Sequence, residues 1–321
     1  MTRLLVPALI ALLMAALASN TNFATAEIAA RPGLIWDVSA GAPIARQALE
    51  KRLAATPYVL LGEKHDNPRH HELQGEIIAG LVQAGRRPSV VWEMLPRAKQ
   101  PILDTFYAQA DLSPDAFAEV IGWAELGWGD WSLFRPIAAA AISGRLPQRA
   151  GGLDRPNVRA VARGGLPALP PDLATRLPAE EPLSASQRRV IEDAVYHGHC
   201  GFVPRDRLGP MISVQIARDL SLADAVATSS PEDGAVLIAG AQHVRLDAGA
   251  PVHLARMQPK ASAISIRFVE ATSENPPDPL DLARTRSHDY LWFTKPGPTK
   301  DYCGDLAKKF GITHKSKSKP R

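Results

Sequence analysis

Length, composition and charge limit what this chain can be. It has 321 residues, 45% of them hydrophobic and 22% charged, which is enough to bury the core of one large domain or two small ones without disulfide support. The net charge of +4 does not indicate a nucleic-acid-binding protein, because six basic and no acidic residues lie in residues 308–321, and the rest is slightly acidic. We therefore expect residues 301–321 to form a basic, disordered tail with no nucleic-acid partner.

The first 26 residues have the features of a secretory signal peptide. Arg3 precedes an apolar run over residues 4–18, and residues 24–26 (ATA) form a small-x-small cleavage site. A retained anchor helix is the alternative, but the run is shorter than the roughly 18 or more residues that a membrane span needs. No cysteine lies near the cleavage site. We expect a chain without a stable membrane anchor that begins near Glu27 and, in a bacterium, is periplasmic and not a lipoprotein.

Two apolar runs separated by a helical pattern predict a β-α-β unit in residues 58–94. The runs YVLLGEKH (58–65) and PSVVWEM (88–94) are rich in β-branched residues and do not alternate, which is typical of strands buried on both faces. Between them, apolar residues recur at helical spacing up to Gly85, which favours a helix end. This is the unit from which parallel sheets are built.

The middle of the chain, about residues 98–230, has helical patterns. Ser113 and Pro114 provide a cap and a first helical position, and Ser184 with Gln187 forms a capping box. We expect a largely helical insertion that covers the C-terminal edge of the sheet.

Two further strands are predicted beyond this segment. The run AVLIAGAQH (235–243) repeats the pattern of the first two, and SAISIRFVE (262–270) predicts a fourth. The expected fold of residues 27–300 is therefore α/β, with a mostly parallel central sheet flanked by helices.

Acidic and imidazole side chains lie at the ends of three predicted strands: Glu63 and His65, then Glu93, then His243. Ligands of parallel α/β sheets bind beyond the C-terminal strand ends, so we expect one shared site. Glu63 and His65 are two residues apart in an extended segment and point the same way. The four residues could bind a divalent metal or act as catalytic acids and bases. The alternative is a buried network that only stabilises the fold.

A polar stripe precedes the third strand. Gln215, Arg218 and Asp219 are three and four residues apart on an otherwise apolar helix. They form either a solvated ion pair or a group that orients the strand-end residues or binds a ligand carboxylate. By contrast, we expect His70 and His71 to belong to the surface of the helix that follows Pro68.

The segment YHGHCG contains potential iron ligands in Tyr196, His197 and His199. Its spacing fits no structural zinc pattern, and ordinary helix capping also explains a histidine and a glycine at a helix end. Cys200 could pair with Cys303 in an oxidising compartment, but the sequence gives no distance between them.

Taken in their order along the chain, the motifs resemble those of the ChaN family of exported haem-binding uptake proteins. That family is distantly similar to the erythromycin esterase, Tiki and TraB group. The resemblance extends from Ile35 to Thr294 and rests on LLGEKHDNPRHHELQGEII, VVWEML, HCGFVP, QIARDLSLADAVA and VLIAGAQHVRLDAGAPVHLA. It implies an α/β/α fold, haem bound as a cofacial pair at a homodimer interface, and a tyrosine iron ligand. The family's motif residues correspond to Gly62, Glu63, His65, Asp66, Glu93, Gln215, Arg218, Asp219 and His243. Members usually carry a lipid anchor, for which this chain has no cysteine.

The resemblance does not map the tyrosine to one position. Among Tyr58, Tyr107, Tyr196, Tyr290 and Tyr302 we favour Tyr196, then Tyr107, because both lie in the helical segment. Nearby aromatic and aliphatic side chains could cover a porphyrin, and basic side chains could pair with its propionates: Phe106, Ile121, Trp123 and Trp128, and Arg205 and Arg207.

The sequence thus leaves three interpretations. The first is a haem-binding protein, with cofactor contacts from Tyr196, Tyr107, His199, Gln215, Arg218 and Asp219. The second is a metal-dependent hydrolase related to the Tiki and erythromycin esterase group, with Glu63, His65, Glu93 and His243 as catalytic or metal-binding residues. The third is a structural network without turnover.

Overall fold

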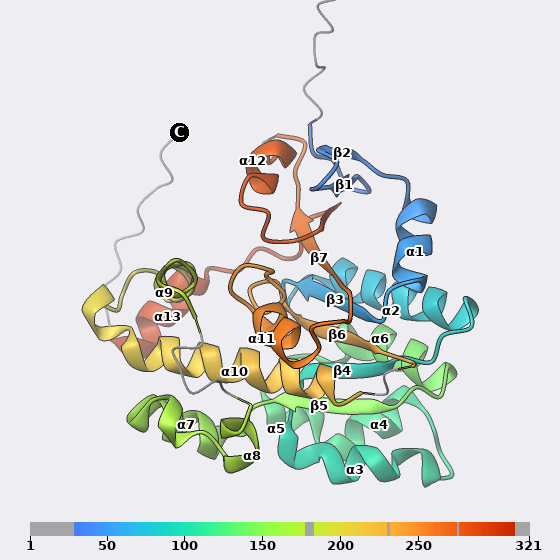
Figure 1. Cartoon of the computed structure of the whole chain (residues 1–321), viewed down its shortest axis with the longest axis horizontal. Coiled ribbons are helices and arrows are strands. Elements are labelled where there is room, and N and C mark those ends of the chain that lie inside the picture. Colours follow the sequence, from blue (N-terminus) through green and yellow to red (C-terminus); the bar gives the residue numbers. More distant parts are fainter. Residues whose placement is uncertain (1–28, 177–182, 230–231, 275, 312–321) are drawn as a thin grey trace, which may run out of the picture.

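The computed structural model describes residues 29–176, 183–229, 232–274 and 276–311 (Figure 1). Eight strands form one sheet in the order β2-β1-β8-β7-β3-β6-β4-β5. Five of its pairings are parallel, and only those of β1 with β2 and β8 are antiparallel. The strands are β1 (Ile35–Asp37), β2 (Ala42–Pro43), β3 (Tyr58–Glu63), β4 (Ser89–Pro96), β5 (Gln148–Gly152), β6 (Ala235–Gly240), β7 (Ala263–Glu270) and β8 (Tyr290–Thr294). The predicted mostly parallel α/β sheet is confirmed.

Thirteen α-helices occur in the described ranges, and several of them cover the two faces of the sheet. They are α1 (Arg46–Ala54), α2 (Pro68–Gln83), α3 (Gln100–Thr105), α4 (Pro114–Ile121), α5 (Trp123–Leu126), α6 (Trp131–Ser143), α7 (Arg155–Gly164), α8 (Pro171–Ala174), α9 (Ala185–Gly198), α10 (Gly209–Ala227), α11 (Ala250–Met257), α12 (Pro279–Ala283) and α13 (Tyr302–Phe310). Alternate residues of β3 point to opposite faces: Val59 and Leu61 pack with α2 and α6, whereas Leu60 packs with α10 and α11. This two-sided burial explains why the central strands lack an alternating polar pattern. None of the helices in the described ranges is long and apolar enough to cross a membrane.

Local sequence signals fix several helix starts. Asn67 accepts hydrogen bonds from the backbone N–H groups of Arg69 and His70 at the start of α2. Ser113 caps α4, and the capping box of Ser184 and Gln187 starts α9, as predicted. The start of α2 matters for the site, because its first turn directly follows the loop after β3.

The expected insertion over residues 98–230 is not purely helical, because β5 extends the central sheet and α10 packs on the sheet face. The sequence of β5, QRAGG, has no apolar run that would predict a strand. Its glycines are required by close packing: a Cβ at Gly152 would lie 2.4 Å from the carbonyl oxygen of Glu93.

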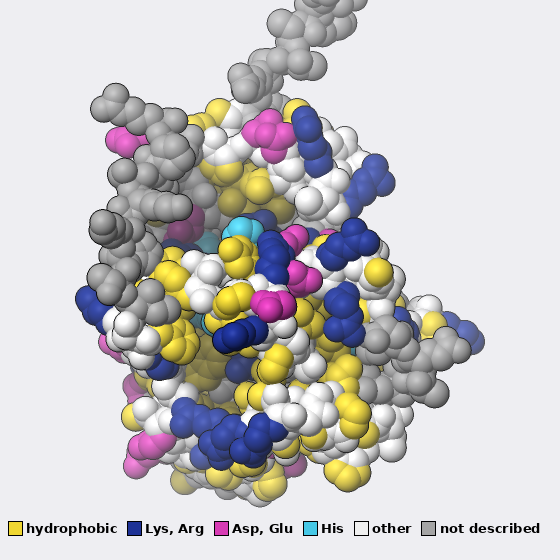
Figure 2. All heavy atoms as spheres, turned by 90° about the vertical axis from the view of Figure 1, so that its left-hand side faces the viewer, with side chains coloured by type: hydrophobic (Ala, Val, Ile, Leu, Met, Phe, Trp, Pro, Cys, Tyr) yellow, Lys and Arg dark blue, Asp and Glu magenta, His cyan; other side chains and the backbone are white. Residues whose placement is uncertain are grey.

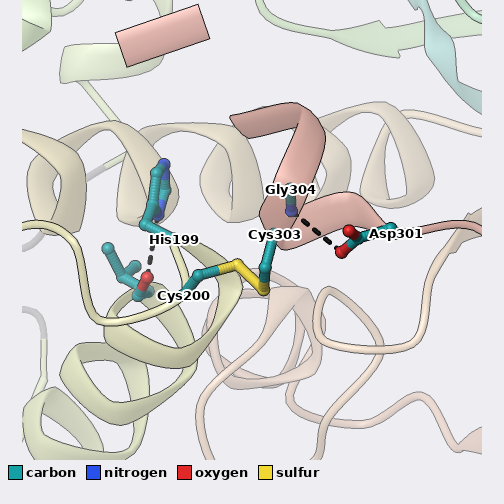
Figure 3. Close-up of a disulfide and its surroundings, with 6 residues drawn as sticks. His199, Cys200, Asp301, Cys303 and Gly304 are labelled. Carbon is teal, nitrogen blue, oxygen red and sulfur yellow. Dashed lines mark hydrogen bonds between the residues drawn. A yellow bond between two sulfur atoms is a disulfide. The ribbon is translucent and has the colours of Figure 1, made fainter. Parts of the chain in front are cut away.

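The expectation of a disordered tail from residue 301 is wrong for Tyr302–Phe310, which form α13. Asp301 caps this helix by accepting a hydrogen bond from the N–H of Gly304. A disulfide joins Cys303 to Cys200 and so ties α13 to the end of α9 (Figure 3). Residues 312–321 and the predicted signal peptide, residues 1–26, lie outside the described residues, which begin at residue 29.

Candidate functional site

The carboxylate of Glu63, at the end of β3, lies between two imidazoles. His65 Nδ1 is 2.8 Å from Glu63 Oε1, and His71 Nε2 is 2.5 Å from Glu63 Oε2. The side chains of Glu63 and His71 are completely buried, whereas that of His65 is 38% exposed. The predicted convergence of Glu63 and His65 is therefore present, and His71 joins them.

A second group lies at the ends of β4 and β6. Glu93 Oε1 is 3.3 Å from His243 Nε2, and Glu93 Oε2 accepts a hydrogen bond from the N–H of Gly240. On its other side, His243 donates from Nδ1 to Asp219 Oδ1 over 2.6 Å. The side chain of Gln215 lies 3.2 Å from the same nitrogen. The polar stripe of α10 therefore reaches the strand ends and orients His243.

His65 connects the two groups. Its Nε2 lies 3.9 Å from Glu93 Oε2, too far for a hydrogen bond but close enough for a charge interaction. A Cβ at Gly240 would come within 3.1 Å of the same nitrogen, so glycine at the end of β6 leaves room for the imidazole. Gly62 is likewise required, because a Cβ there would lie 2.4 Å from the side chain of Val244.

Mutual charge interactions determine the protonation of this site. Burial alone would raise the pKa of Glu63, but His71 and His65 outweigh it and lower that pKa to about 2. His243 and His65 likewise lower the pKa of the buried Glu93.

The two imidazoles shift in the opposite direction. Burial opposes protonation of His243, but Glu93 and Asp219 outweigh it and raise its pKa to about 10. Burial also opposes protonation of His65, while Glu93 and Glu63 raise its pKa to about 9. At neutral pH these shifts leave Glu63 and Glu93 as carboxylates and His65 and His243 as imidazolium groups, while burial raises the pKa of Asp219 to about 6.

A cavity of about 380 Å³ adjoins this network. Its apolar wall includes Leu126, Trp128, Leu153, Val158 and Leu222, and Glu93 also lines it. The ring of His65 packs edge-on against Trp128, with centroids 5.0 Å apart. The cavity therefore connects the charged network to an apolar surface of a size typical of small-molecule sites.

Three arginines border the same cavity: Arg155 and Arg159 from α7, and Arg218 from α10. Arg155 donates to the carbonyl oxygen of Leu126. In the part of the chain that the structure describes, neither Arg159 nor Arg218 has an ion-pair or hydrogen-bond partner. Figure 2, which faces the side of the molecule where α7 and α9 lie, shows a recessed apolar surface with basic side chains on its borders. Unpaired guanidinium groups beside an apolar cavity suit a ligand with carboxylates.

The structure places the predicted tyrosines elsewhere. The hydroxyl of Tyr107 donates to the carbonyl oxygen of Leu146, two residues before β5 begins, and so lies at the N-terminal ends of the strands, opposite the strand-end site. Tyr196 packs against the apolar cluster of α9 and α10, and the guanidinium of Arg205 stacks over its ring at 4.4 Å. Neither residue lines the cavity.

Two other predicted cofactor contacts also lie away from the cavity. His199 donates from Nδ1 to the carbonyl oxygen of Val195 beside the Cys200–Cys303 disulfide (Figure 3). Arg205 is paired with Glu192 and Asp193.

The expectation that His70 and His71 belong to the helix surface is wrong, because both are fully buried. His70 accepts a hydrogen bond from the N–H of Lys64 and contacts Thr294, and His71 pairs with Glu63. Since α2 starts immediately after the β3 loop, its first turn faces the sheet. Pro68 marks the start of this helix in the sequence, but it does not show which face of the first turn points toward the sheet.

The predicted metal site is not supported by this geometry. Within the described ranges, no group of three or more His, Cys, Asp or Glu side chains is arranged to hold a metal ion. The physical reason is the pairing itself: Glu63, Glu93 and Asp219 direct oxygens at imidazole nitrogens, so the donors face one another instead of a common point.

Comparison with known proteins agrees with the fold. A family model described as haem-binding uptake, Tiki superfamily, ChaN matches residues 49–254, which is more than half of the chain. A solved structure described as cofacial haem binding to ChaN of Campylobacter jejuni is 18% identical, with a TM-score of 0.66, over 80% of this chain and 95% of that one. The type III effector HopBA1 is 12% identical, with a TM-score of 0.41, over 85% of this chain and 100% of that one. No curated protein matches the chain. The chain belongs to the family of haem-binding uptake proteins described as Tiki superfamily, ChaN.

Proposed function

We propose that this protein binds haem in the cavity beside the strand ends and serves in haem or iron uptake. The observation that carries the proposal is a cavity with an apolar wall bordered by the guanidinium groups of Arg159 and Arg218, neither of which has an ion-pair or hydrogen-bond partner among the described residues. Haem has an apolar macrocycle and two propionate carboxylates, so it needs both features in one place. The described residues fit this requirement.

The contacts divide between the two parts of the cofactor. Trp128 and Leu153 would pack against the porphyrin, and Arg159 and Arg218 would pair with the propionates. When bound, the haem would supply an iron centre that takes a nitrogen or oxygen ligand from the protein. Within the polar stripe of α10, Arg218 would therefore bind a ligand carboxylate. Asp219 and Gln215 instead orient His243.

Export and dimerisation are further parts of the proposal. We place the mature chain in the periplasm after removal of residues 1–26, and the disulfide between Cys200 and Cys303 supports an oxidising compartment. A homodimer would form when haem binds, because the Campylobacter jejuni structure is described as cofacial haem binding. Light scattering of the mature chain with and without haemin tests this part.

A haemin titration tests the central proposal. The mature chain from Glu27 should give a saturable shift of the Soret band with ferric haemin, and the dimethyl ester of haemin, which lacks free carboxylates, should bind more weakly. Replacing both Arg159 and Arg218 with alanine should weaken haemin binding but change ester binding little. Arg284→Ala is a matched control, because that arginine, directly after α12, is 79% exposed and pairs only with Asp281 in the described structure. If haemin does not saturate, or if haemin and its ester bind equally, the proposal is wrong.

Hydrolysis is a second candidate function, favoured by the buried alternation of carboxylates and imidazolium groups. A carrier has no evident need for such groups, whereas they could transfer protons to and from a water molecule. A screen of ester and amide substrates tests this candidate, with His243→Gln as the variant expected to lose turnover. Turnover that is the same in His243→Gln as in the parent would contradict it.

A further inference from the structure

The chain that follows β8 crosses the loop between β3 and α2, residues 64–67. The side-chain amide of Asn67 donates to the carbonyl oxygen of Lys295 over 3.0 Å. The N–H of Gly297 donates to Glu270 Oε1, which also accepts from the amide of Asn67. A Cβ at Gly297 would lie 3.1 Å from the Cα of Asn67, so the two backbones are in close contact. The end of the chain is therefore fixed to this loop.

Asp66, in the same loop, binds the segment further along. The hydroxyl of Tyr302 donates to Asp66 Oδ2, and Lys300 Nζ lies 3.9 Å from the same oxygen. The side chain of Asp66 is only 9% exposed, so a hydrogen bond to its carboxylate is well shielded from water. We call residues 295–303 the C-terminal brace, because they contact the loop along their length and end at Cys303.

The disulfide holds the far end of the C-terminal brace. Cys303, next to Tyr302, is bonded to Cys200 just after α9, so that α13 lies beside α9 (Figures 1 and 3). Helix α13 gives the brace little support of its own, since it has nine residues and Ala307 is the only one that is buried. Isolated helices of this length are marginal in water. Opening the disulfide would therefore free Tyr302 from Asp66.

The loop held by the C-terminal brace leads to the cavity. His65 lies in this loop, and its ring packs against Trp128 with centroids 5.0 Å apart. Its Nε2 lies 3.9 Å from Glu93 Oε2. Both Trp128 and Glu93 line the cavity. A contiguous series of contacts thus joins the disulfide to the cavity wall.

From these contacts we propose that the Cys200–Cys303 disulfide is a redox switch for the cavity. When it is closed, the C-terminal brace fixes the loop and the cavity keeps its binding form. When it is reduced, the loop is released and ligand binding weakens, because the ligand must then order the loop. The inference rests on the proposed haem site for its ligand, whereas release of the loop can be measured without haem.

The reductant is a dithiol. One of its thiolates attacks a disulfide sulfur, and the Sγ–Sγ bond breaks as a mixed disulfide forms. The second thiolate displaces the protein sulfur and closes the disulfide of the reagent. Cys200 and Cys303 end as thiols with the two protons of the dithiol, so the protein gains the two electrons that the reagent loses.

Hydrogen exchange of residues 64–67 and a haemin titration test the inference. Both are measured on the mature chain before and after reduction with dithiothreitol, which is removed without air before haemin is added. Reduction should speed exchange at this loop, where the N–H of Asn67 donates to the carbonyl oxygen of Lys64. It should weaken haemin binding at least about fivefold, the lower end of the usual coupling between two sites. Reoxidation should restore both values.

Two kinds of variant separate the disulfide from the contact it holds. A double variant, Cys200→Ser with Cys303→Ser, should bind haemin like the reduced parent and should not respond to dithiothreitol. Tyr302→Phe should speed exchange of the loop while the disulfide stays closed, because it removes the hydrogen bond to Asp66. Tyr107→Phe is the matched control, since it removes a tyrosine hydroxyl at the N-terminal ends of the strands and should leave exchange of the loop unchanged.

The inference is overturned if the reduced parent has free thiols but unchanged exchange at residues 64–67, or unchanged haemin affinity. Exchange that rises equally throughout the chain would also overturn it. Failure of the oxidised parent to bind haemin would overturn the proposed function and with it the effect on affinity, whereas exchange still decides whether the disulfide holds the loop. Should the reduced chain unfold, Tyr302→Phe in the oxidised chain decides, and exchange equal to that of the parent would overturn the inference.

Discussion

The pair formed by Asp219 and His243 should make the stability of this protein depend strongly on pH. The two groups are 2.6 Å apart, with side chains 1% and 8% exposed. Removing one partner of a buried pair costs about 3–5 kcal/mol, and weakening a hydrogen bond to a charged group costs about 1.5–3 kcal/mol. Burial raises the pKa of Asp219 to about 6, so its carboxylate is fully charged only above that pH. Because asparagine keeps the shape and one acceptor oxygen, we expect Asp219→Asn to lower the free energy of unfolding by about 1.5–3 kcal/mol at pH 7.5.

The pH dependence follows from the pKa of His243. Its folded-state pKa of about 10 lies above the value of about 6.5 expected in the unfolded chain. The resulting stabilisation is complete below pH 6.5 and is lost as the pH rises toward 10. In Asp219→Asn only Glu93 would remain as an anionic partner of His243, so the loss should occur at lower pH.

Urea unfolding of both proteins between pH 6 and pH 9.5, monitored by circular dichroism, measures these effects. Asp281→Asn is a matched control, because Asp281 is 62% exposed and pairs with Arg284 at the surface. The control should change the free energy of unfolding by less than about 1 kcal/mol. The reasoning is refuted if Asp219→Asn is as stable as the control, or if its stability varies with pH as the parent's does.

Two further predictions concern the same scaffold. Replacing Cys303 with serine should destabilise the chain by about 2–5 kcal/mol, because the disulfide closes a loop over 103 positions, and thermal unfolding with and without reductant checks this. The lowered pKa of Glu63 gives stability that is complete above pH 4.5 and is lost as the pH falls toward 2, so Glu63→Gln should flatten the acid side of the stability curve. Urea midpoints at pH 3 and pH 6 measure that change, and an equally steep acid limb in the variant would contradict it.

Much of the fold could be predicted from local patterns, because parallel strands buried on both faces appear in the sequence as continuous apolar runs. The apolar runs of β3, β4 and β6 predicted that the C-terminal ends of these strands meet at one edge of the sheet. Glu63, Glu93 and His243 lie at that edge. Strand β5 could not be found in this way, since its close contacts require glycine instead of apolar side chains.

The rest of the site depends on rotations and distances that a sequence does not contain. The first turn of α2 faces inward and brings His71 to Glu63, although a histidine after Pro68 would equally suit an exposed helix. Arg159 lies on an amphipathic helix whose orientation toward the cavity is set by tertiary packing. The tyrosines were ranked by their presence in the helical segment, and that criterion could not tell which sheet edge Tyr107 would reach.

A crystal structure of the haemin complex, with the iron located by its anomalous scattering, tests the central claim most directly. The account predicts an iron peak inside the cavity bordered by Trp128 and Arg218. Iron bound at Tyr196 on α9, or elsewhere outside this cavity, would contradict it.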